Sequence, residues 1–172
     1  MRVHVDRILQ IQKKDRGLGG FLFAEIPVEP FVKDFNAEED GSALTWERFD
    51  LSKWAFFMAF DDDKPVGGAA VATRTKELNM LQGREDIALL WDIRVDEPYK
   101  RRNVGQTLFD MAIAWSRTQS MKQLKIECQN DNIPAVRFYH KQGAALCAVD
   151  EYAYADAPLT PYEIQLIWYL EL

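Results

Sequence analysis

The sequence has little of the chemistry that metal centres and disulfide frameworks need. Its 172 residues include two cysteines and two histidines. Cys128 and Cys147 have neither metal-ligand spacing nor the density of a disulfide scaffold. We therefore expect no metal site, two small buried thiols in a reducing compartment, and His4 and His140 at the surface.

Long hydrophobic runs are also missing. The longest apolar run, residues 54–60, is far shorter than a bilayer-spanning helix. The first seven residues, Met1–Arg7, contain no apolar segment of the kind found in secretion signals. These absences predict a cytoplasmic protein without a membrane partner.

Positive charge is in deficit. The chain has 21 Lys and Arg against 27 Asp and Glu, a net charge of -6. This balance argues against the broad basic surface of a nucleic-acid-binding protein, since such surfaces attract phosphate by an excess of cations. Two acidic runs, Glu38–Asp40 and Asp61–Asp63, could attract a polycationic substrate, or could be solvated turns.

The most informative stretch present runs from Trp91 to Trp115 and changes its hydrophobic period in the middle. Apolar residues alternate with polar ones over residues 89–95, which predicts a strand. After Pro98 the spacing becomes helical, and it places one apolar face on the predicted helix: Val104, Leu108, Met111, Ala112 and Trp115.

A basic loop without acidic residues, Tyr99–Gly105, joins the predicted strand to the helix. The first turn of a helix has N–H groups without intrahelical partners, so it can hold an anion such as a phosphate. Gly105 permits close approach, Asn103 can cap the helix or take a left-handed turn, and full charges come from Lys100, Arg101 and Arg102. The alternative is a solvated basic loop before an ordinary helix.

The remaining pattern predicts an α/β (α+β mixed) fold. Residues 54–60 and 66–74 read as an antiparallel hairpin, and residues 121–128, 145–154 and 162–170 as further strands. A second helix covers 132–142, with Asp131 or Asn132 as its cap and Gly143 at its end. The first fifty residues show weaker patterns. They predict a loop at 17–20, a strand or helix at 21–26, and irregular structure with one helical turn at 30–46.

Two segments resemble motifs of the GNAT superfamily of acyl-CoA-dependent N-acetyltransferases. Residues 95–108 resemble motif A, Arg/Gln-x-x-Gly-x-Gly/Ala, with Lys100 at the first position, Asn103 in place of the first Gly and Gly105 at the second. Residues 132–143 are similar to motif B, Asn-x-x-Ala-x-x-Phe-Tyr-x-x-x-Gly, at every specified position. The order and spacing of the two motifs also agree.

The resemblance implies a fold and a division of the chain. The implied fold is a central mixed, mostly antiparallel sheet flanked by helices, with a splayed parallel strand pair that admits the pantetheine of coenzyme A. It further implies a single domain over 1–172, with 1–50 on the acceptor side, 86–143 as the acetyl-CoA-binding core, and 144–172 as C-terminal strands.

The resemblance also implies roles for individual residues. Tyr139 would protonate the departing thiolate, although an aromatic pair on a helix can equally be core packing. Asp92 would be the base for the acceptor amine, with Glu127, Glu151 or a water chain as alternatives. The implied contacts to acetyl-CoA are Ile93, Arg94, Val95, Lys100, Arg101, Arg102, Asn103, Val104, Gly105, Gln106, Asn132, Ala135 and Tyr139.

Within the superfamily, residues 128–143 and 167–170 look most like streptothricin acetyltransferases and their relatives, although Trp91 stands where those proteins tend to carry a glutamate. The implied activity is direct transfer of an acetyl group from acetyl-CoA to a primary amine of a small, cationic acceptor, with a role in antibiotic resistance. Two alternatives stay open: a non-catalytic acyl-CoA-binding or sensor domain, and a peptide or protein N-acetyltransferase. The apolar C-terminal residues Ile164, Leu166, Ile167, Trp168 and Leu170 could form a homodimer interface or belong to the core.

Overall fold

The computed structural model describes residues 1–35, 43–156 and 162–172. The chain forms two compact units. Unit 1 contains residues 1, 34–127 and 169–172, and unit 2 contains residues 2–33 and 128–168. The acidic run at residues 38–40 lies outside the described residues, and so do residues 157–161 between the two predicted C-terminal strands. The expected single domain, with its three regions, stays a prediction.

Unit 1 is built on the hairpin that the sequence predicted. Strand β3 (Trp54–Asp61) pairs antiparallel with β4 (Lys64–Thr73), and β4 pairs antiparallel with β5 (Ile87–Val95). The residues of β5 from Ile87 to Leu90 are all buried, since both faces of this strand are covered there. The acidic run at 61–63 is exposed at the hairpin turn, as expected of a solvated turn.

Strand β5 changes partner arrangement at Trp91. The parallel pairing with β6 (Gln123–Gln129) covers Ile87–Leu90 and Gln123–Ile126. At the same place the register with β4 slips: Leu90 lies opposite Val71 and Asp92 opposite Ala70, which makes Trp91 the extra residue of a β-bulge. A bulge bends its strand. The segment from Trp91 to Val95 therefore continues beyond the last parallel pair, as expected for a splayed pair.

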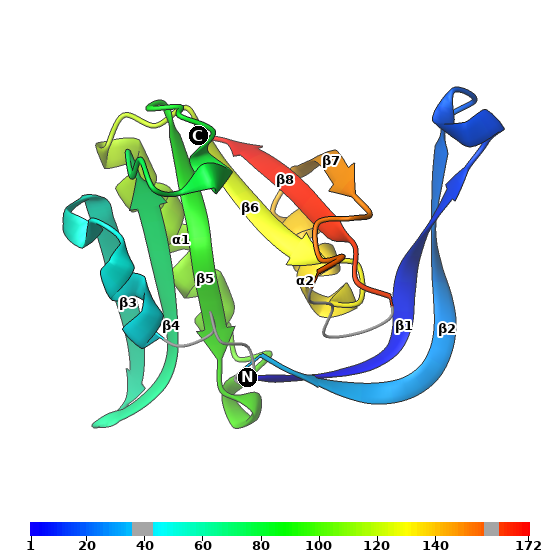
Figure 1. Cartoon of the computed structure of the whole chain (residues 1–172). Coiled ribbons are helices and arrows are strands. Elements are labelled where there is room, and N and C mark those ends of the chain that lie inside the picture. Colours follow the sequence, from blue (N-terminus) through cyan, green and yellow to red (C-terminus); the bar gives the residue numbers. More distant parts are fainter. Residues whose placement is uncertain (36–42, 157–161) are drawn as a thin grey trace. The chain divides into compact units, whose positions relative to one another are not determined.

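Helix α1 (Val104–Thr118) packs against β3, β4 and β5 (Figure 1). Its buried face differs from the expected one. Met111 is 45% exposed, whereas Phe109 and Ser116 are buried with Leu108 and Ala112. The reason is that the helix lies against three strands, β3, β4 and β5, so the buried stripe is centred about one residue away from the face predicted from spacing.

The six-stranded sheet has the order β3-β4-β5-β6-β8-β7, with β7 at Ala145–Asp150 and β8 at Gln165–Glu171. One strand pair in it is parallel and the β3-β4 and β4-β5 pairs are antiparallel. This confirms the predicted mixed α/β fold. In β8, Leu166, Ile167 and Trp168 are buried within the chain, which supports the core interpretation of these residues. A homodimer stays a prediction.

Unit 2 contains a two-stranded sheet of β1 (Arg2–Lys13) and β2 (Phe21–Asp34). The expected irregular structure from residue 30 is wrong for residues 30–34, because β2 runs through Pro27 and Pro30. Proline is tolerated in such a strand because a two-stranded ribbon has outer edges where no N–H donor is needed. A short 3-10 turn, η1 (Asp15–Gly17), includes Gly17, and residues 18–20 form the rest of the expected loop.

Helix α2 (Ile133–Lys141) is the second element of unit 2. Asn132 caps it by accepting a hydrogen bond from the backbone N–H of Ala135 at 3.3 Å, and Gly143, with φ 85°, ends the segment as predicted. Among its described residues, unit 1 has four 3-10 turns: η3 (Ala43–Arg48), η4 (Leu51–Lys53), η5 (Asn79–Leu81) and η6 (Glu97–Tyr99). Within the described residues, no helix is long and apolar enough to cross a membrane.

The two thiols do not share the expected burial. Cys128 is buried, but Cys147 is exposed. The expectation of a buried Cys147 is wrong because β7 is the terminal strand of the sheet, and four of its six residues are exposed. His4 and His140 are exposed, as predicted.

Candidate active site

In unit 1, the part of β5 beyond its bulge carries four of the predicted site residues: Asp92, Ile93, Arg94 and Val95. The antiparallel register with β4 extends over all four. The parallel register with β6 ends before them, at Leu90. Main-chain groups on that side of β5 can therefore bond to an amide-containing ligand, as the implied pantetheine contacts require.

The loop before α1 has the conformation of an anion-binding turn. Arg101 and Asn103 both have left-handed backbone angles, φ 59° and φ 66°. Asn103 makes no side-chain cap, so of its two expected roles the structure shows the left-handed turn. The first hydrogen bond of the helix runs from Thr107 N to Asn103 O at 2.9 Å, so the N–H groups of Val104 and Gly105 have no carbonyl within the helix to bond.

Gly105 offers a direct test of whether this turn fits a phosphate group. A Cβ added there would meet one side chain, the Val95 Cγ2 atom, at 3.7 Å, which is an ordinary contact. Packing of the protein therefore does not require glycine at this position. Beyond the two neighbouring residues and the backbone of the helix itself, no other atom lies within 4 Å of that Cβ position, and Arg101 and Arg102 in the same loop are exposed. The residues present fit a pyrophosphate.

Tyr99 organises the cations around this loop, a role that sequence reasoning missed. The Arg102 guanidinium and the Lys64 ammonium each lie 5.4 Å from the centre of the Tyr99 ring. The Tyr99 hydroxyl donates to Asp61 Oδ2 at 2.8 Å, and this hydrogen bond raises the pKa of the phenol. The three basic residues that directly follow Tyr99 were the available signal, but they did not reveal the contact to Asp61.

Asp92 lies next to Arg94 on β5, with 2.7 Å between Arg94 Nε and Asp92 Oδ1. Burial raises the pKa of the Asp92 carboxyl, and the positive charge of Arg94 opposes that rise. A carboxylate with a raised pKa binds a proton more readily than an exposed aspartate does. A general base needs such an environment. The ion pair with Arg94 is also compatible with a purely structural role for Asp92.

The bulge residue Trp91 closes an aromatic cluster on the other side of the strand. Its ring lies 5.5 Å from that of Phe49 and 5.7 Å from that of Trp54, both edge-on. Beside it is a hollow of about 440 Å³ lined by Arg48, Phe49, Glu77, Leu78, Asn79, Met80 and Trp91. Trp91 therefore has a packing role of its own at the position where the resembled proteins tend to carry a glutamate.

In unit 2, α2 carries the other predicted residues, Asn132, Ala135 and Tyr139. The Asn132 side chain is nearly buried, and its Oδ1 atom is used by the helix cap. The Tyr139 side chain is 5% exposed, with its ring 5.5 Å from that of Phe138. The structure thus shows the capping role of Asn132 and the burial of Tyr139, and their roles toward acetyl-CoA stay predictions.

A buried charge cluster, which the sequence did not reveal, immediately precedes the cap of α2. Lys33 Nζ lies 3.3 Å from Asp131 Oδ1 and also pairs with Glu163 Oε1, and all three side chains are at most 3% exposed. Asn130 beside them accepts a hydrogen bond from Ile164 N at 2.8 Å and donates one to Leu9 O at 3.2 Å. The turn that carries Asn132 is fixed by long-range contacts.

The other candidate bases have different surroundings. Glu127 on β6 is partly buried, and Glu151 pairs with Lys13 in unit 2.

Among residues 1–35, 43–156 and 162–172, no group of three or more His, Cys, Asp or Glu side chains is arranged to hold a metal ion.

Comparison with known proteins agrees with the features above. The model of the Acetyltransferase (GNAT) family matches residues 22–144. The chain is 36% identical over 159 residues to Streptothricin acetyltransferase A of Bacillus subtilis (strain 168), with 83% of this chain and 90% of that protein covered. It is 26% identical to Streptothricin acetyltransferase of Escherichia coli, over 87% of this chain and 76% of that protein.

Solved structures share the fold. Nourseothricin acetyltransferase superposes with a TM-score of 0.75 at 23% identity and covers 99% of this chain and 86% of its own. A protein of Bacillus anthracis str. Ames, crystallised in complex with acetyl coenzyme A, superposes with a TM-score of 0.76 at 22% identity and covers 99% of this chain and 89% of its own.

Proposed function

The chain belongs to the Acetyltransferase (GNAT) family and is an acyl-CoA-dependent N-acetyltransferase that uses acetyl-CoA; on that premise we propose that its acceptor is a small, cationic, streptothricin-like compound with a primary amine. The observation that carries this proposal is the 36% identity to Streptothricin acetyltransferase A over 83% of the chain. The net charge of -6 supports it, because an acidic protein attracts a cationic acceptor.

Unit 1 supplies the residues proposed to hold the donor. Acetyl-CoA supplies the acetyl group as a thioester. The N–H groups at the start of α1, with Lys100, Arg101, Arg102, Asn103 and Gln106, bind the pyrophosphate. Main-chain groups of Ile93, Arg94 and Val95 bond to the pantetheine amides, and one N–H of this strand polarises the thioester carbonyl. On α2 of unit 2, Asn132 and Ala135 contact the pantetheine arm.

Two side chains carry the proton transfers in this proposal. Asp92, directly or through water, accepts a proton from the acceptor ammonium, whose pKa of about 10 keeps it charged at neutral pH. The free amine attacks the thioester carbon and a C–N bond forms; the attacking nitrogen then loses its second proton to water as the C–S bond breaks. Tyr139 donates its phenolic proton to the departing thiolate and is then reprotonated from solvent. The transfer is direct and forms no acyl-enzyme.

The test is thiol release from acetyl-CoA against a panel of amines: streptothricin, polyamines, aminoglycosides and lysine-containing peptides. We expect turnover with streptothricin-like polycations at the highest kcat/KM. A preference for peptides would replace the proposal by peptide N-acetylation. No turnover with any amine, while acetyl-CoA still raises the melting temperature, would contradict the proposed acceptor class and favour a binding or sensor role.

A further inference from the structure

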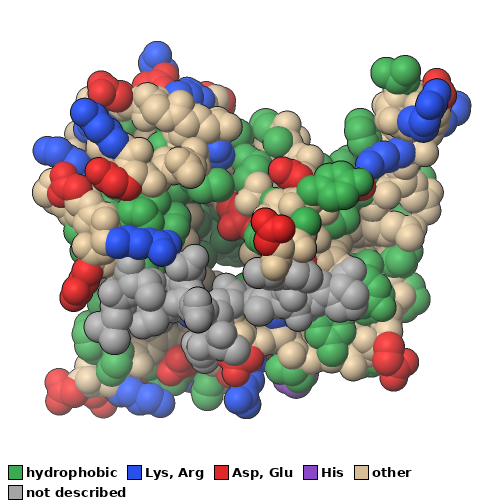
Figure 2. Space-filling model, viewed as in Figure 1, with side chains coloured by type: hydrophobic (Ala, Val, Ile, Leu, Met, Phe, Trp, Pro, Cys, Tyr) green, Lys and Arg blue, Asp and Glu red, His purple; other side chains and the backbone are tan. Residues whose placement is uncertain are grey.

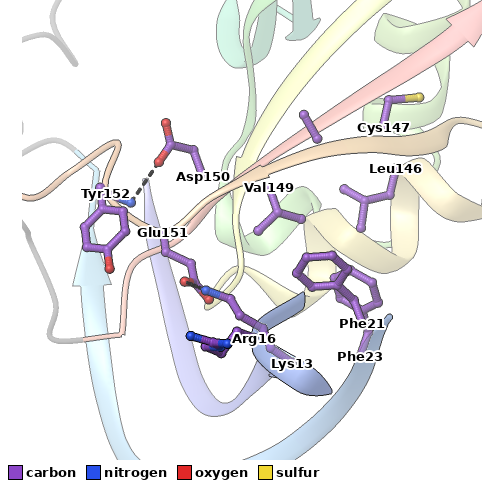
Figure 3. Close-up of a pocket in the computed structure, with 11 residues that line it drawn as sticks. Lys13, Arg16, Phe21, Phe23, Leu146, Cys147, Val149, Asp150, Glu151 and Tyr152 are labelled. Atoms are coloured by element: carbon purple, nitrogen blue, oxygen red, sulfur yellow. Dashed lines mark hydrogen bonds and ion pairs between the residues drawn. The ribbon is translucent and has the colours of Figure 1, made fainter. Parts of the chain in front are cut away.

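The described chain leaves large apolar side chains open to water in both units. In unit 2, Phe21 and Phe23 line a hollow of about 660 Å³ beside β7 (Figure 3). The charged side chains of that hollow are two cations and two anions: Lys13, Arg16, Asp150 and Glu151. This balance favours neither a cationic nor an anionic ligand.

In unit 1, an apolar stripe lies on the outer strand of the sheet. Phe56, Met58 and Phe60 of β3 are 48%, 57% and 58% exposed. Their spacing of two residues places them on one face of the strand. Figure 2 shows hydrophobic and acidic side chains close together at the lower left, where Figure 1 places the β3-β4 hairpin. Apolar side chains of this size, grouped on one strand, indicate a surface that another molecule covers.

The outer edge of β3 is unpaired within the described residues. Strand β3 is first in the strand order, with β4 as its neighbour. Main-chain hydrogen bonds from turns and loops of the described chain reach none of residues 54–61. Natural sheets protect such an edge with a charged side chain, a proline or a bulge. The pairing with β4 is regular from Trp54 to Ala59, and this stretch contains no charged residue and no proline. The edge is therefore a regular template for another strand.

The sequence of this edge is complementary to a second copy of itself. The apolar run Trp54–Phe60 is flanked by a cation, Lys53, and an anion, Asp61, and both are exposed. When two such strands pair antiparallel about a two-fold axis at Phe57, each residue faces the one that is equally far from the axis on the other strand. The two apolar runs then oppose each other along their whole length. Lys53 of each copy faces Asp61 of the other.

Neighbouring symmetric registers lose this match. An axis at Met58 would set the carboxylate of Asp61 against Ala55, and an axis at Phe56 would leave Lys53 facing Ala59. The charges at the two ends of the apolar run therefore select one register and favour a second copy of this chain over an unrelated strand.

We propose that the outer edge of β3 is a dimer interface, at which two copies of this chain pair antiparallel about a two-fold axis at Phe57. On the open face, Phe56 of each copy then contacts Met58 of the other, and cross-strand pairs of sulfur with an aromatic ring are stabilising. The pairing occupies both β3 edges, so it closes at two copies. The interface is distinct from the C-terminal residues 164–170.

Sedimentation equilibrium of the full chain tests the interface from about 1 µM to about 100 µM, a range that covers weak and standard-sized interfaces. We expect the parent to reach twice the chain mass of 19.9 kDa. Met58→Lys should stay monomeric, because it replaces apolar contacts near the axis by two ammonium groups. Leu18→Lys is the control. Leu18 is 93% exposed in unit 2 and lies in no strand, so this variant should dimerise as the parent does.

A charge exchange tests the register itself. Lys53→Glu should raise the dissociation constant of the dimer about tenfold, because two-fold symmetry makes the repulsion with Asp61 occur twice. Lys53→Glu/Asp61→Lys restores opposite charges and should return the constant to within about twofold of the parent value. Lys76→Glu makes the same change of net charge at an exposed residue outside β3 and should leave the constant unchanged.

A parent that stays monomeric at the highest concentration would overturn the interface. A dimer that persists in both Met58→Lys and Lys53→Glu would overturn it too, since that dimer would use another surface. Growth of the parent beyond two copies would contradict the closed two-fold pairing. Melting temperatures at the lowest concentration check that each variant folds. If Met58→Lys does not fold, Lys53→Glu and its charge-exchanged partner decide the outcome.

Discussion

At the scale of single residues, Tyr139 is the clearest test of the proposed chemistry. Replacing it by phenylalanine removes one hydroxyl and leaves a ring in a position that is 95% buried. If the phenol protonates the thiolate, Tyr139→Phe should lower kcat by roughly 10²- to 10⁴-fold with little change in KM for acetyl-CoA. The measurement is steady-state thiol release. Tyr169→Phe serves as the control, and a similar kcat in both variants would leave Tyr139 with a packing role.

Asp92 should appear in the pH dependence. Because burial raises its pKa above the ordinary 3.8, the acidic limb of kcat/KM should lie above that value and disappear in Asp92→Asn. The same shift affects stability: a carboxyl whose folded pKa is raised stabilises the fold most below its unfolded pKa, and this contribution declines as pH rises toward the folded pKa. Thermal unfolding of both proteins from pH 3 to 7 should show that decline in the parent alone.

An acidic limb that persists unchanged in Asp92→Asn would exclude this carboxylate as the base. Glu127 would then be the next candidate to replace. Glu151 is less suited, since it forms an ion pair with Lys13.

Single residues also mark where sequence reasoning ended. Tyr139 and Asn132 were identifiable because the motif B spacing is local in the chain. The exposure of Cys147 and the burial of Lys33 were not, since each depends on a partner or a strand order far away in sequence. Lys33 and Asp131 are separated by 98 positions. The spacing of hydrophobic residues within a short segment cannot indicate such a long-range pair.

At the scale of elements, two glycines around the start of α1 should behave oppositely. A Cβ at Gly67 of β4 would lie 2.9 Å from Arg94 O, so Gly67→Ala should destabilise the fold by roughly 1–3 kcal/mol. Gly105→Ala meets one ordinary contact, and alanine favours a helix, so stability should rise by about 0.5–1 kcal/mol. KM for acetyl-CoA should nevertheless increase in Gly105→Ala, because the added methyl group obstructs the phosphate.

Urea unfolding and acetyl-CoA titration of both variants check this pair. A Gly105→Ala protein that binds acetyl-CoA as tightly as the parent would contradict the placement of the pyrophosphate at this helix start.

The turn before α2 should depend on its buried charges. Lys33→Met leaves the carboxylates of Asp131 and Glu163 buried without their cation, and we expect a loss of about 3–5 kcal/mol in the free energy of unfolding. The exposed Lys14→Met is the control and should change stability by less than about 0.5 kcal/mol. Restoration of stability in Lys33→Met/Asp131→Asn/Glu163→Gln would confirm that the unpaired charges, and not the lost side-chain volume, cause the effect.

The elements themselves were largely predictable, with one informative exception. Hydrophobic period located β3, β4, β5 and α1, and the cap residue with the closing glycine located α2. The bulge at Trp91 was not visible, because an inserted residue in β5 keeps an apolar side chain in the alternation and only the register with β4 reveals it. That bulge is where the parallel pairing with β6 ends, so the feature most specific to the site was the one that pattern reading could not supply.

At the scale of the whole molecule, the net charge of -6 should govern the encounter with the acceptor. The screening length falls from about 30 Å at 0.01 M salt to about 8 Å at 0.15 M. Because attraction over the surface is screened in that range, kcat/KM for a polycationic acceptor should fall several-fold between these salt concentrations, mainly through KM. The decrease of kcat/KM with salt should be steeper for acceptors of higher charge, so streptothricin-like polycations should show a larger loss than a monocationic amine with the same reacting group.

Stopped-flow or steady-state thiol release at a series of NaCl concentrations measures this salt dependence, with sucrose-matched samples to exclude viscosity effects. Equal slopes for monocation and polycation would mean that contacts within the site, and not the field of the acidic surface, select the acceptor.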